Sequence, residues 1–259
     1  MPEFLEIDGR VLHVAFRAGQ GRPVVFSNSL GTDLRIWDGV VAALPEGTPV
    51  LRMDKRGHGL SEGTADTIEA FAGDAAAVMG RYGISGAVVC GVSIGGLVAQ
   101  GLALARPDLV SALLLSTTGL RIGTPRSWQD RMEAVRAGGL DAVADGMMER
   151  WFSPAFRRAQ PAVVAGYRTM LARQSPGGYL AACAALRDAD FTEAAPRIGQ
   201  PALCLAGETD IATPPETLRA LADALPRGRY REIAGVGHLP CIEAPEAVSA
   251  ALTELGAGG

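Results

Sequence analysis

A serine framed by glycines, Gly91-Val92-Ser93-Ile94-Gly95, is the residue pattern with the clearest chemical potential in this sequence. It follows an apolar run, residues 87–90, and precedes residues 97–105, whose composition favours a helix. Strand, tight turn and helix together match the nucleophile elbow, in which a strained turn presents the serine hydroxyl. We therefore expect Ser93 to be the nucleophile of an acyl-transfer reaction.

Acyl transfer also needs N–H donors for the negative oxygen of its intermediate. Because Ser93 opens a helix, the free N–H of Ile94 is expected to be one donor. A second polar loop, Asn28-Ser29-Leu30-Gly31-Thr32, follows a short predicted strand at residues 23–27. Such loops bind ligand groups in open α/β sheets, so the N–H of Leu30 is the predicted second donor.

The general base and its acid partner are expected late in the chain. His238 lies on a glycine-flanked loop after a predicted strand at residues 229–233, and Asp210 follows the predicted strand 201–207. Glu208 competes with Asp210 for the acid role but follows its strand immediately, so Asp210 is preferred. His58, between two glycines, is the alternative base; His238 is preferred because Ser93, Asp210 and His238 occur in the nucleophile, acid, base order of an α/β-hydrolase.

The elements that must position these residues alternate between strand and helix. Strands are predicted at 23–27, 49–53, 87–90, 110–116, 201–207 and 229–233, with helices between them. This alternation predicts a mostly parallel central sheet covered by helices on both faces. A hairpin with Asp8-Gly9 at its turn is expected to precede it, leaving His13 on the exposed face of its second strand without a role.

Residues 120–190 depart from this alternation, because their apolar residues recur at helical spacing. We expect a helical lid at 120–190 inserted into a core made of 1–119 and 191–259. The lid contains ten arginines against seven acidic residues, an excess suited to an anionic substrate, since guanidinium pairs with carboxylate. Arg131 and Arg121 are the candidate substrate ligands, although solvated helix faces account for most such arginines. Trp128 and Trp151 are expected to wall the pocket or to pack in the core.

Composition excludes several other classes of function. The net charge of −4, without long runs of one sign, disfavours a nucleic-acid surface. No apolar run is long enough to span a bilayer and no signal-peptide pattern is present, so no membrane association and a cytoplasmic location are expected. The four cysteines are widely spaced without a Cys/His cluster, so neither a metal site nor a disulfide framework is predicted, and the expected chemistry needs no cofactor.

The whole chain resembles the α/β-hydrolase superfamily, and more closely bacterial 3-oxoadipate enol-lactonases. The elbow around Ser93, Arg56-Gly57-His58-Gly59 and the late Asp210 and His238 are shared with many α/β-hydrolases. Residues 28–32, where relatives usually carry His-Gly, are the more selective match; the remaining matching residues are Trp37, Asp54, Leu60-Ser61, Arg150-Trp151-Phe152, Ile211-Ala212-Thr213-Pro214-Pro215 and Leu239-Pro240.

The resemblance implies hydrolysis of a small anionic lactone, 3-oxoadipate enol-lactone, in aromatic catabolism. Another serine hydrolase of the same fold is the first alternative: a carboxylesterase, a cofactor-free haloperoxidase-like perhydrolase or a carbon–carbon bond hydrolase. Haloalkane dehalogenases and epoxide hydrolases are disfavoured, because their nucleophile is aspartate and position 93 is serine. A non-catalytic ligand-binding member of the fold is the second alternative. The oligomeric state is not indicated.

Overall fold

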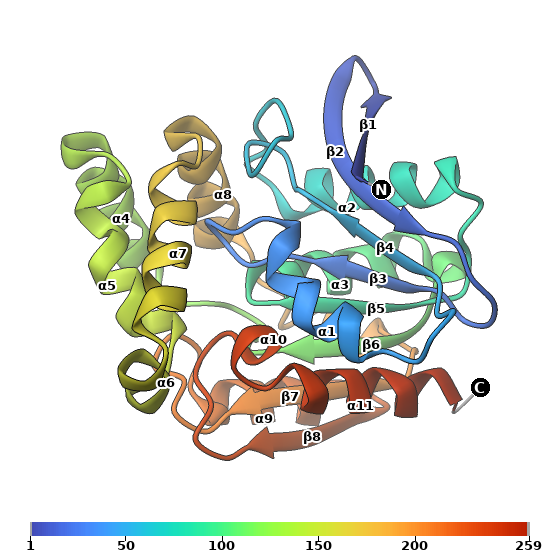
Figure 1. Cartoon of the computed structure of the whole chain (residues 1–259). Coiled ribbons are helices and arrows are strands. Elements are labelled where there is room, and N and C mark those ends of the chain that lie inside the picture. Colours follow the sequence, from blue (N-terminus) through green and yellow to red (C-terminus); the bar gives the residue numbers. More distant parts are fainter. Residues whose placement is uncertain (1, 258–259) are drawn as a thin grey trace.

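The computed structural model describes residues 2–257 and contains one central sheet (Figure 1). Within these residues the sheet has eight strands in the order β1-β2-β4-β3-β5-β6-β7-β8. β1 and β4 both run antiparallel to β2, and every other neighbouring pair is parallel. The strands are β1 Pro2–Ile7, β2 Arg10–Arg17, β3 Val24–Ser27, β4 Val50–Met53, β5 Ala87–Val92, β6 Val110–Ser116, β7 Ala202–Gly207 and β8 Gly228–Ile233.

Helices cover both faces of this sheet. α1 (Asp38–Ala43) packs against α11 (Pro245–Ala257) on one face, and α2 (Ile68–Arg81) packs against α3 (Ile94–Ala105) on the other (Figure 1). α9 (Pro215–Ala224) packs on β7 and β8. The predicted strand and helix alternation, and with it the α/β-hydrolase fold class, is therefore confirmed. The remaining elements of the core are the 3-10 helices Leu34–Trp37, Pro107–Leu109 and Ala195–Arg197 and the short helix α10 Pro240–Glu243.

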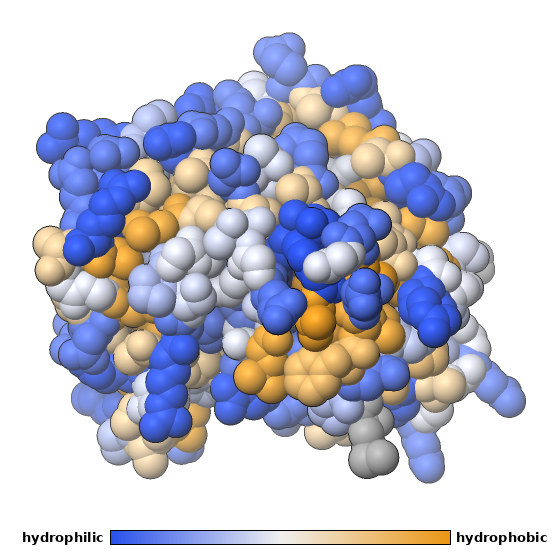
Figure 2. Space-filling model, turned by 90° about the horizontal axis from the view of Figure 1, so that it is seen from above, coloured by the Kyte–Doolittle hydropathy of each residue, from blue (hydrophilic) through white to orange (hydrophobic). Residues whose placement is uncertain are grey.

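The central strands are buried on both faces, which explains their continuous apolar runs. Every residue of β5 and of β7 is buried. A parallel strand covered by helices above and below cannot alternate polar and apolar side chains. Hydrophilic residues cover most of the surface seen in Figure 2, with apolar residues gathered in smaller patches between them. In residues 2–257, no helix has both the length and the apolar character needed to cross a membrane.

The predicted hairpin is present, but the prediction for His13 is wrong. β1 and β2 pair through a turn at Asp8 and Gly9, whose φ angles are +49° and +73°. His13, expected to be exposed, is only 9% exposed. The loop after β4 covers this face of β2, since Ser61 Oγ accepts the His13 N–H at 2.9 Å. Strand periodicity identified two faces but not that both would be covered.

Residues 120–190 contain helices and no strand. They form α4 (Pro125–Gly138), α5 (Asp141–Trp151), α6 (Pro154–Ala159), α7 (Pro161–Ala172) and α8 (Pro176–Asp188). These helices lie together beyond the carboxyl ends of the parallel strands (Figure 1). Loops that leave those strand ends therefore face the helical segment, where a cleft between the two can form.

Candidate active site

Ser93 lies on a strained turn between β5 and α3. Its φ of +59° and ψ of −123° place a residue with a Cβ in a region that costs of order 1–3 kcal/mol. Two hydrogen bonds hold the turn: Ser93 N–H donates to Ser116 O at 3.1 Å, and Thr118 Oγ1 donates to Ser93 O at 2.8 Å. The end of β6 thus fixes the backbone that aims the Ser93 hydroxyl.

Close backbone contacts explain why glycines flank Ser93. A Cβ at position 91 would lie 2.1 Å from the carbonyl oxygen of Gly95, and a Cβ at position 95 would lie 2.1 Å from that of Ser27. Neither distance is physically possible without moving the backbone. The glycine at each position is therefore what allows the turn to form.

His238 and Asp210 form a buried pair. The loop after β8 carries His238 and the loop after β7 carries Asp210, and His238 Nδ1 lies 2.8 Å from Asp210 Oδ2. Asp210 also accepts hydrogen bonds from the Ala212 and Thr213 N–H groups and from Thr213 Oγ1, at 2.7, 3.1 and 2.7 Å. This arrangement fixes the imidazole through Nδ1 and leaves Nε2 as the ring nitrogen available to a neighbouring group.

The competing acid and base take other positions. Glu208 is exposed, and its carboxylate accepts the N–H of Gly235 at 2.7 Å. His58 is buried, its Nδ1 lies 3.1 Å from Arg56 O, and burial lowers its pKa well below the usual value. Neither residue lines the cavity that contains Ser93.

Ser93 and His238 line one cavity of about 120 Å³. The predicted wall residues Trp128 and Trp151 line it as well, as does Leu30. No hydrogen bond joins Ser93 to His238 in the described residues, which is common before a substrate draws such groups together. The fold therefore brings Ser93 and His238, the predicted nucleophile and base, to one small space lined by residues of α4 and α5.

Two backbone amides are free beside Ser93. Ile94 is the first residue of α3, where an N–H has no intrahelical acceptor. Within residues 2–257, neither Leu30 N–H nor Ile94 N–H donates to another backbone group. Both amides come from the segments where oxyanion donors were predicted.

Of the two arginines predicted as substrate ligands, one lines the Ser93 cavity and the other does not. Arg131 lines the cavity, with its Cζ atom 5.5 Å from the centroid of the Trp128 ring and its guanidinium in contact with Met147 Sδ. Arg121 does not line it: its side chain is half exposed and pairs with Asp190 at 3.1 Å. Arg121 thus joins the start of the helical segment to its end, away from the Ser93 cavity.

Arg150 is the cavity residue that the sequence reasoning did not select as a ligand. It shares the cavity wall with Arg131, and its pKa is lowered by burial and by the positive charge of Arg131. In the described part of the chain, neither guanidinium pairs with a carboxylate. Helical spacing was the available signal, because residues 147, 150 and 151 lie on one face of α5 and all three line the cavity.

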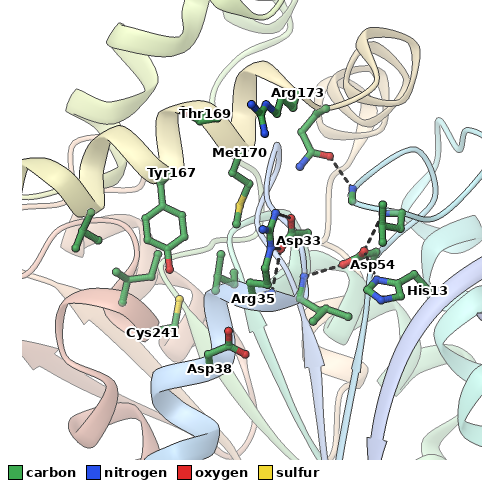
Figure 3. Close-up of a pocket in the computed structure, with 18 of the residues that line it drawn as sticks. His13, Asp33, Arg35, Asp38, Asp54, Tyr167, Thr169, Met170, Arg173 and Cys241 are labelled. Atoms are coloured by element: carbon green, nitrogen blue, oxygen red, sulfur yellow. Dashed lines mark hydrogen bonds and ion pairs between the residues drawn. The ribbon is translucent and has the colours of Figure 1, made fainter. Parts of the chain in front are cut away.

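A second, larger groove of about 810 Å³ lies between α7 and the core (Figure 3). It is lined in part by His13 and Asp54, and His13 Nδ1 lies 2.7 Å from Asp54 Oδ2. No serine lines it, and Asp54 also accepts the N–H groups of Leu34 and Leu60 at 2.7 and 2.9 Å. Asp54 thus anchors two loops. Cys241 also lines this groove, and burial raises the pKa of its thiol, which disfavours the reactive thiolate.

Comparison with known proteins identifies similar chains. Residues 24–251 match the sequence profile of the alpha/beta hydrolase family. 3-Oxoadipate enol-lactonase 2 from Acinetobacter baylyi is 32% identical over 231 residues, covering 88% of this chain and 86% of that protein.

In the described residues, no group of three or more His, Cys, Asp or Glu side chains is placed to hold a metal ion.

Solved structures give the same pattern of similarity. The enol-lactonase from Burkholderia xenovorans superposes with a TM-score of 0.93 at 36% identity, covering 98% of this chain and 99% of that one. A thermophilic esterase from Thermogutta terrifontis, solved with malate bound, superposes with a TM-score of 0.88 at 30% identity, covering 98% and 97%.

Proposed function

Because the chain belongs to the alpha/beta hydrolase family, we propose that it hydrolyses 3-oxoadipate enol-lactone to 3-oxoadipate in the cytoplasmic breakdown of aromatic compounds. One observation carries the proposal. Ser93 and His238, whose ring Asp210 holds, line a cavity whose wall also contains two arginines, Arg131 and Arg150, that have no carboxylate partner among the described residues. A serine mechanism explains why Ser93 and His238 lie together, and an anionic lactone explains why these two arginines lie beside them.

In the proposed mechanism, Ser93 Oγ attacks the lactone carbonyl while neutral His238 accepts the hydroxyl proton at Nε2. Asp210 holds the imidazole in the required tautomer and stabilises its charged form. The N–H groups of Leu30 and Ile94 donate to the tetrahedral oxyanion, each such donor lowering the barrier by about 3 kcal/mol.

Collapse of this intermediate breaks the ring C–O bond, and His238 returns its proton to the departing enolate oxygen. The enol then ketonises, while the acyl group remains on Ser93. A water molecule attacks the acyl-enzyme with His238 again as base, which releases the carboxylate and restores the serine hydroxyl. An enolate is a better leaving group than an alkoxide, so ring opening suits this machinery, and these steps need no cofactor.

The substrate's free carboxylate is proposed to lie against Arg131 and Arg150. Two neighbouring guanidinium groups repel one another, and this repulsion contributes to the lowered pKa of Arg150. A carboxylate that receives N–H bonds from both would relieve it. Trp128 and Trp151 would enclose the apolar part of the lactone.

A carboxylesterase acting on neutral esters is the second candidate. Its support is the structural similarity to the Thermogutta terrifontis esterase, and it would use the same serine, histidine and aspartate. A neutral ester has no carboxylate for Arg131 and Arg150 to bind, so the anionic lactone is the preferred substrate. A protein that only binds its ligand would not require Ser93 or His238.

The experiment is hydrolysis of freshly generated 3-oxoadipate enol-lactone, followed by loss of ultraviolet absorbance, beside a neutral p-nitrophenyl ester. We expect kcat/KM for the lactone to exceed that for the ester at least about 100-fold, and Ser93→Ala to abolish both activities. Rapid ester cleavage without lactone turnover would reject the substrate and keep the hydrolase. No turnover of either compound would favour the binder.

A further inference from the structure

Lys55 is the one lysine among the chain's 24 basic residues, and it is buried. Lys55 is only 6% exposed, although it lies in the loop that follows β4. Burying an ammonium group costs free energy unless a partner compensates it. Every other basic position carries arginine, so a buried lysine here calls for an explanation from its contacts.

The ammonium group donates a hydrogen bond to the loop at residues 28–32, which carries the proposed Leu30 donor. Lys55 Nζ lies 2.5 Å from the carbonyl oxygen of Ser29, which also accepts a hydrogen bond from Thr32 Oγ1 at 2.9 Å. In residues 2–257, Lys55 forms no ion pair, although Asp54 and Asp33 act on its charge from a distance.

Both of these carboxylates are held by other groups. Asp33 pairs with Arg35 at 2.6 Å, and Asp54 binds His13 and two backbone amides (Figure 3). The Ser29 carbonyl is therefore the direct partner of the buried lysine.

That carbonyl belongs to the peptide unit whose N–H is the proposed Leu30 donor. The chain has no cis peptide bond in its described residues, and in a trans peptide the C=O and N–H bonds point in opposite directions. Fixing the Ser29 carbonyl toward Lys55 therefore directs the Leu30 N–H away from it. Ser29, Leu30 and Ser93 line the same cavity, whereas Lys55 is not among its lining residues and borders a different small cavity in the interior.

We propose that Lys55 is a positioning residue for catalysis: its ammonium group holds and polarises the Ser29–Leu30 peptide so that the Leu30 N–H donates to the oxyanion formed at Ser93. The inference rests on the proposed function, because it assumes that Leu30 serves an oxyanion. A positive charge on the carbonyl side of a peptide makes its N–H a stronger donor. A neutral side chain of the same size would fill the space without this effect.

The surroundings of Lys55 make its charge sensitive to pH. Burial lowers its pKa from 10.5 to about 7, opposed by the negative charges of Asp54 and Asp33. His58, the other titratable neighbour, is itself held neutral by burial and by the charge of Lys55. The side chains from β3, β5, α2 and α3 around the small cavity beside Lys55 are apolar or uncharged. The positioning effect should therefore weaken as pH rises through about 7.

The same shift predicts the opposite trend for stability. A base whose pKa is lower in the folded state binds fewer protons there than in the unfolded chain. Folding is therefore penalised below about pH 7, and the penalty is relieved as pH rises from about 7 toward 10.5. Lys55→Met, which removes the buried charge and keeps the length, should leave Tm unchanged or raised at pH 6.

The test compares Lys55→Met with Arg56→Met. Arg56 is the adjacent cation, but it pairs with the buried Asp74 and, within residues 2–257, forms no hydrogen bond with Ser29. The measured quantities are Tm and the rate of Ser93 acylation by p-nitrophenyl acetate from pH 5 to 9. We expect Lys55→Met to lower acylation about 10- to 100-fold at pH 6 with a smaller deficit at pH 8.5, and Arg56→Met to lower Tm with the acylation profile unchanged.

A third readout uses the single lysine directly. In a chain labelled with ¹⁵N at the lysine Nζ, one side-chain signal should titrate near pH 7. A phosphonate adduct on Ser93 should raise that midpoint, because the partial negative charge of its phosphoryl oxygen favours the charged ammonium. A merely structural lysine would not respond to the adduct.

The outcomes separate this inference from the proposed function. The role of Lys55 alone would be overturned by either of two results. One is equal acylation rates of wild type and Lys55→Met at every pH, and the other is a lysine titration midpoint that the phosphonate adduct does not change. Because acylation by an acetate ester does not involve the lactone, failure of lactone hydrolysis would leave this test intact. A wild type that is not acylated at Ser93 would overturn both proposals.

Discussion

Residues 2–257 contain two buried histidine–aspartate pairs, and they differ in what surrounds them. His238 and Asp210 meet at 2.8 Å beside a cavity of about 120 Å³, whereas His13 and Asp54 meet at 2.7 Å beside a groove of about 810 Å³. Neither the distance within the pair nor the size of the adjacent space shows which pair is the better candidate for catalysis.

The difference lies in the third partner. The smaller cavity contains Ser93 on a strained turn and two amides without backbone acceptors, whereas the larger groove has no serine in its lining. In the larger groove, the aspartate binds the amides of two loops and the histidine lies against the ring of Phe4, with centroids 5.2 Å apart. A histidine–aspartate pair becomes a catalytic site only where a nucleophile and oxyanion donors share its space.

The largest expected effect separates the two histidines. His238→Ala should lower kcat about 10⁴-fold or more, as Ser93→Ala should, because the serine loses its base. His13→Ala should keep kcat within about threefold, since His13 does not face Ser93. Steady-state kinetics on the lactone measure both. A His13 variant as inactive as the His238 variant would reverse the assignment of the two pairs.

The two aspartates should separate activity from stability. In Asp210→Asn the amide presents an N–H group to His238 Nδ1, which forces the wrong tautomer, so kcat should fall about 10³- to 10⁴-fold with Tm nearly unchanged. In Asp54→Asn, either amide orientation places a donor against a backbone N–H of Leu34 or Leu60. Unfolding free energy should fall by about 2–4 kcal/mol.

Thermal unfolding and kinetics at one pH suffice to check this contrast. The comparison would fail if the Asp54 variant kept its stability and lost turnover.

The smallest effects concern substrate binding. Arg131→Gln and Arg150→Gln should each raise KM for the anionic lactone about 10-fold and leave KM for a neutral ester within about twofold, since a charged hydrogen bond contributes about 1.5–3 kcal/mol. Arg173→Gln, which removes an arginine from the larger groove, is the matched control and should change neither value. Equal effects of Arg131→Gln on both substrates would remove the carboxylate role.

Local patterns predicted the residues around the Ser93 cavity more fully than the segments that pack around it. The tight turn at Ser93, the loop positions of Asp210 and His238, and the alternation of strands and helices each follow from local residue patterns, so sequence alone located these features. The exposure of His13, the partner of Arg121 and the cavity position of Arg150 depend on which segments meet in space. Local periodicity specifies a face of an element, whereas only the packed chain decides what covers that face.

Lys55 illustrates the same limit. Its sequence context places it in a loop, where a lysine normally lies in solvent, and only the folded chain brings its ammonium group to the Ser29 carbonyl.

The central claim is that Ser93, activated by His238, is the nucleophile, and covalent labelling tests it most directly. The intact chain is incubated with a serine-directed phosphonate, its mass is measured, and the modified peptide is sequenced. We expect one adduct, on Ser93, formed at the wild-type rate in His13→Ala and at least about 1,000-fold more slowly in His238→Ala. An adduct on any other residue, or equally rapid labelling of the His238 variant, would contradict the account.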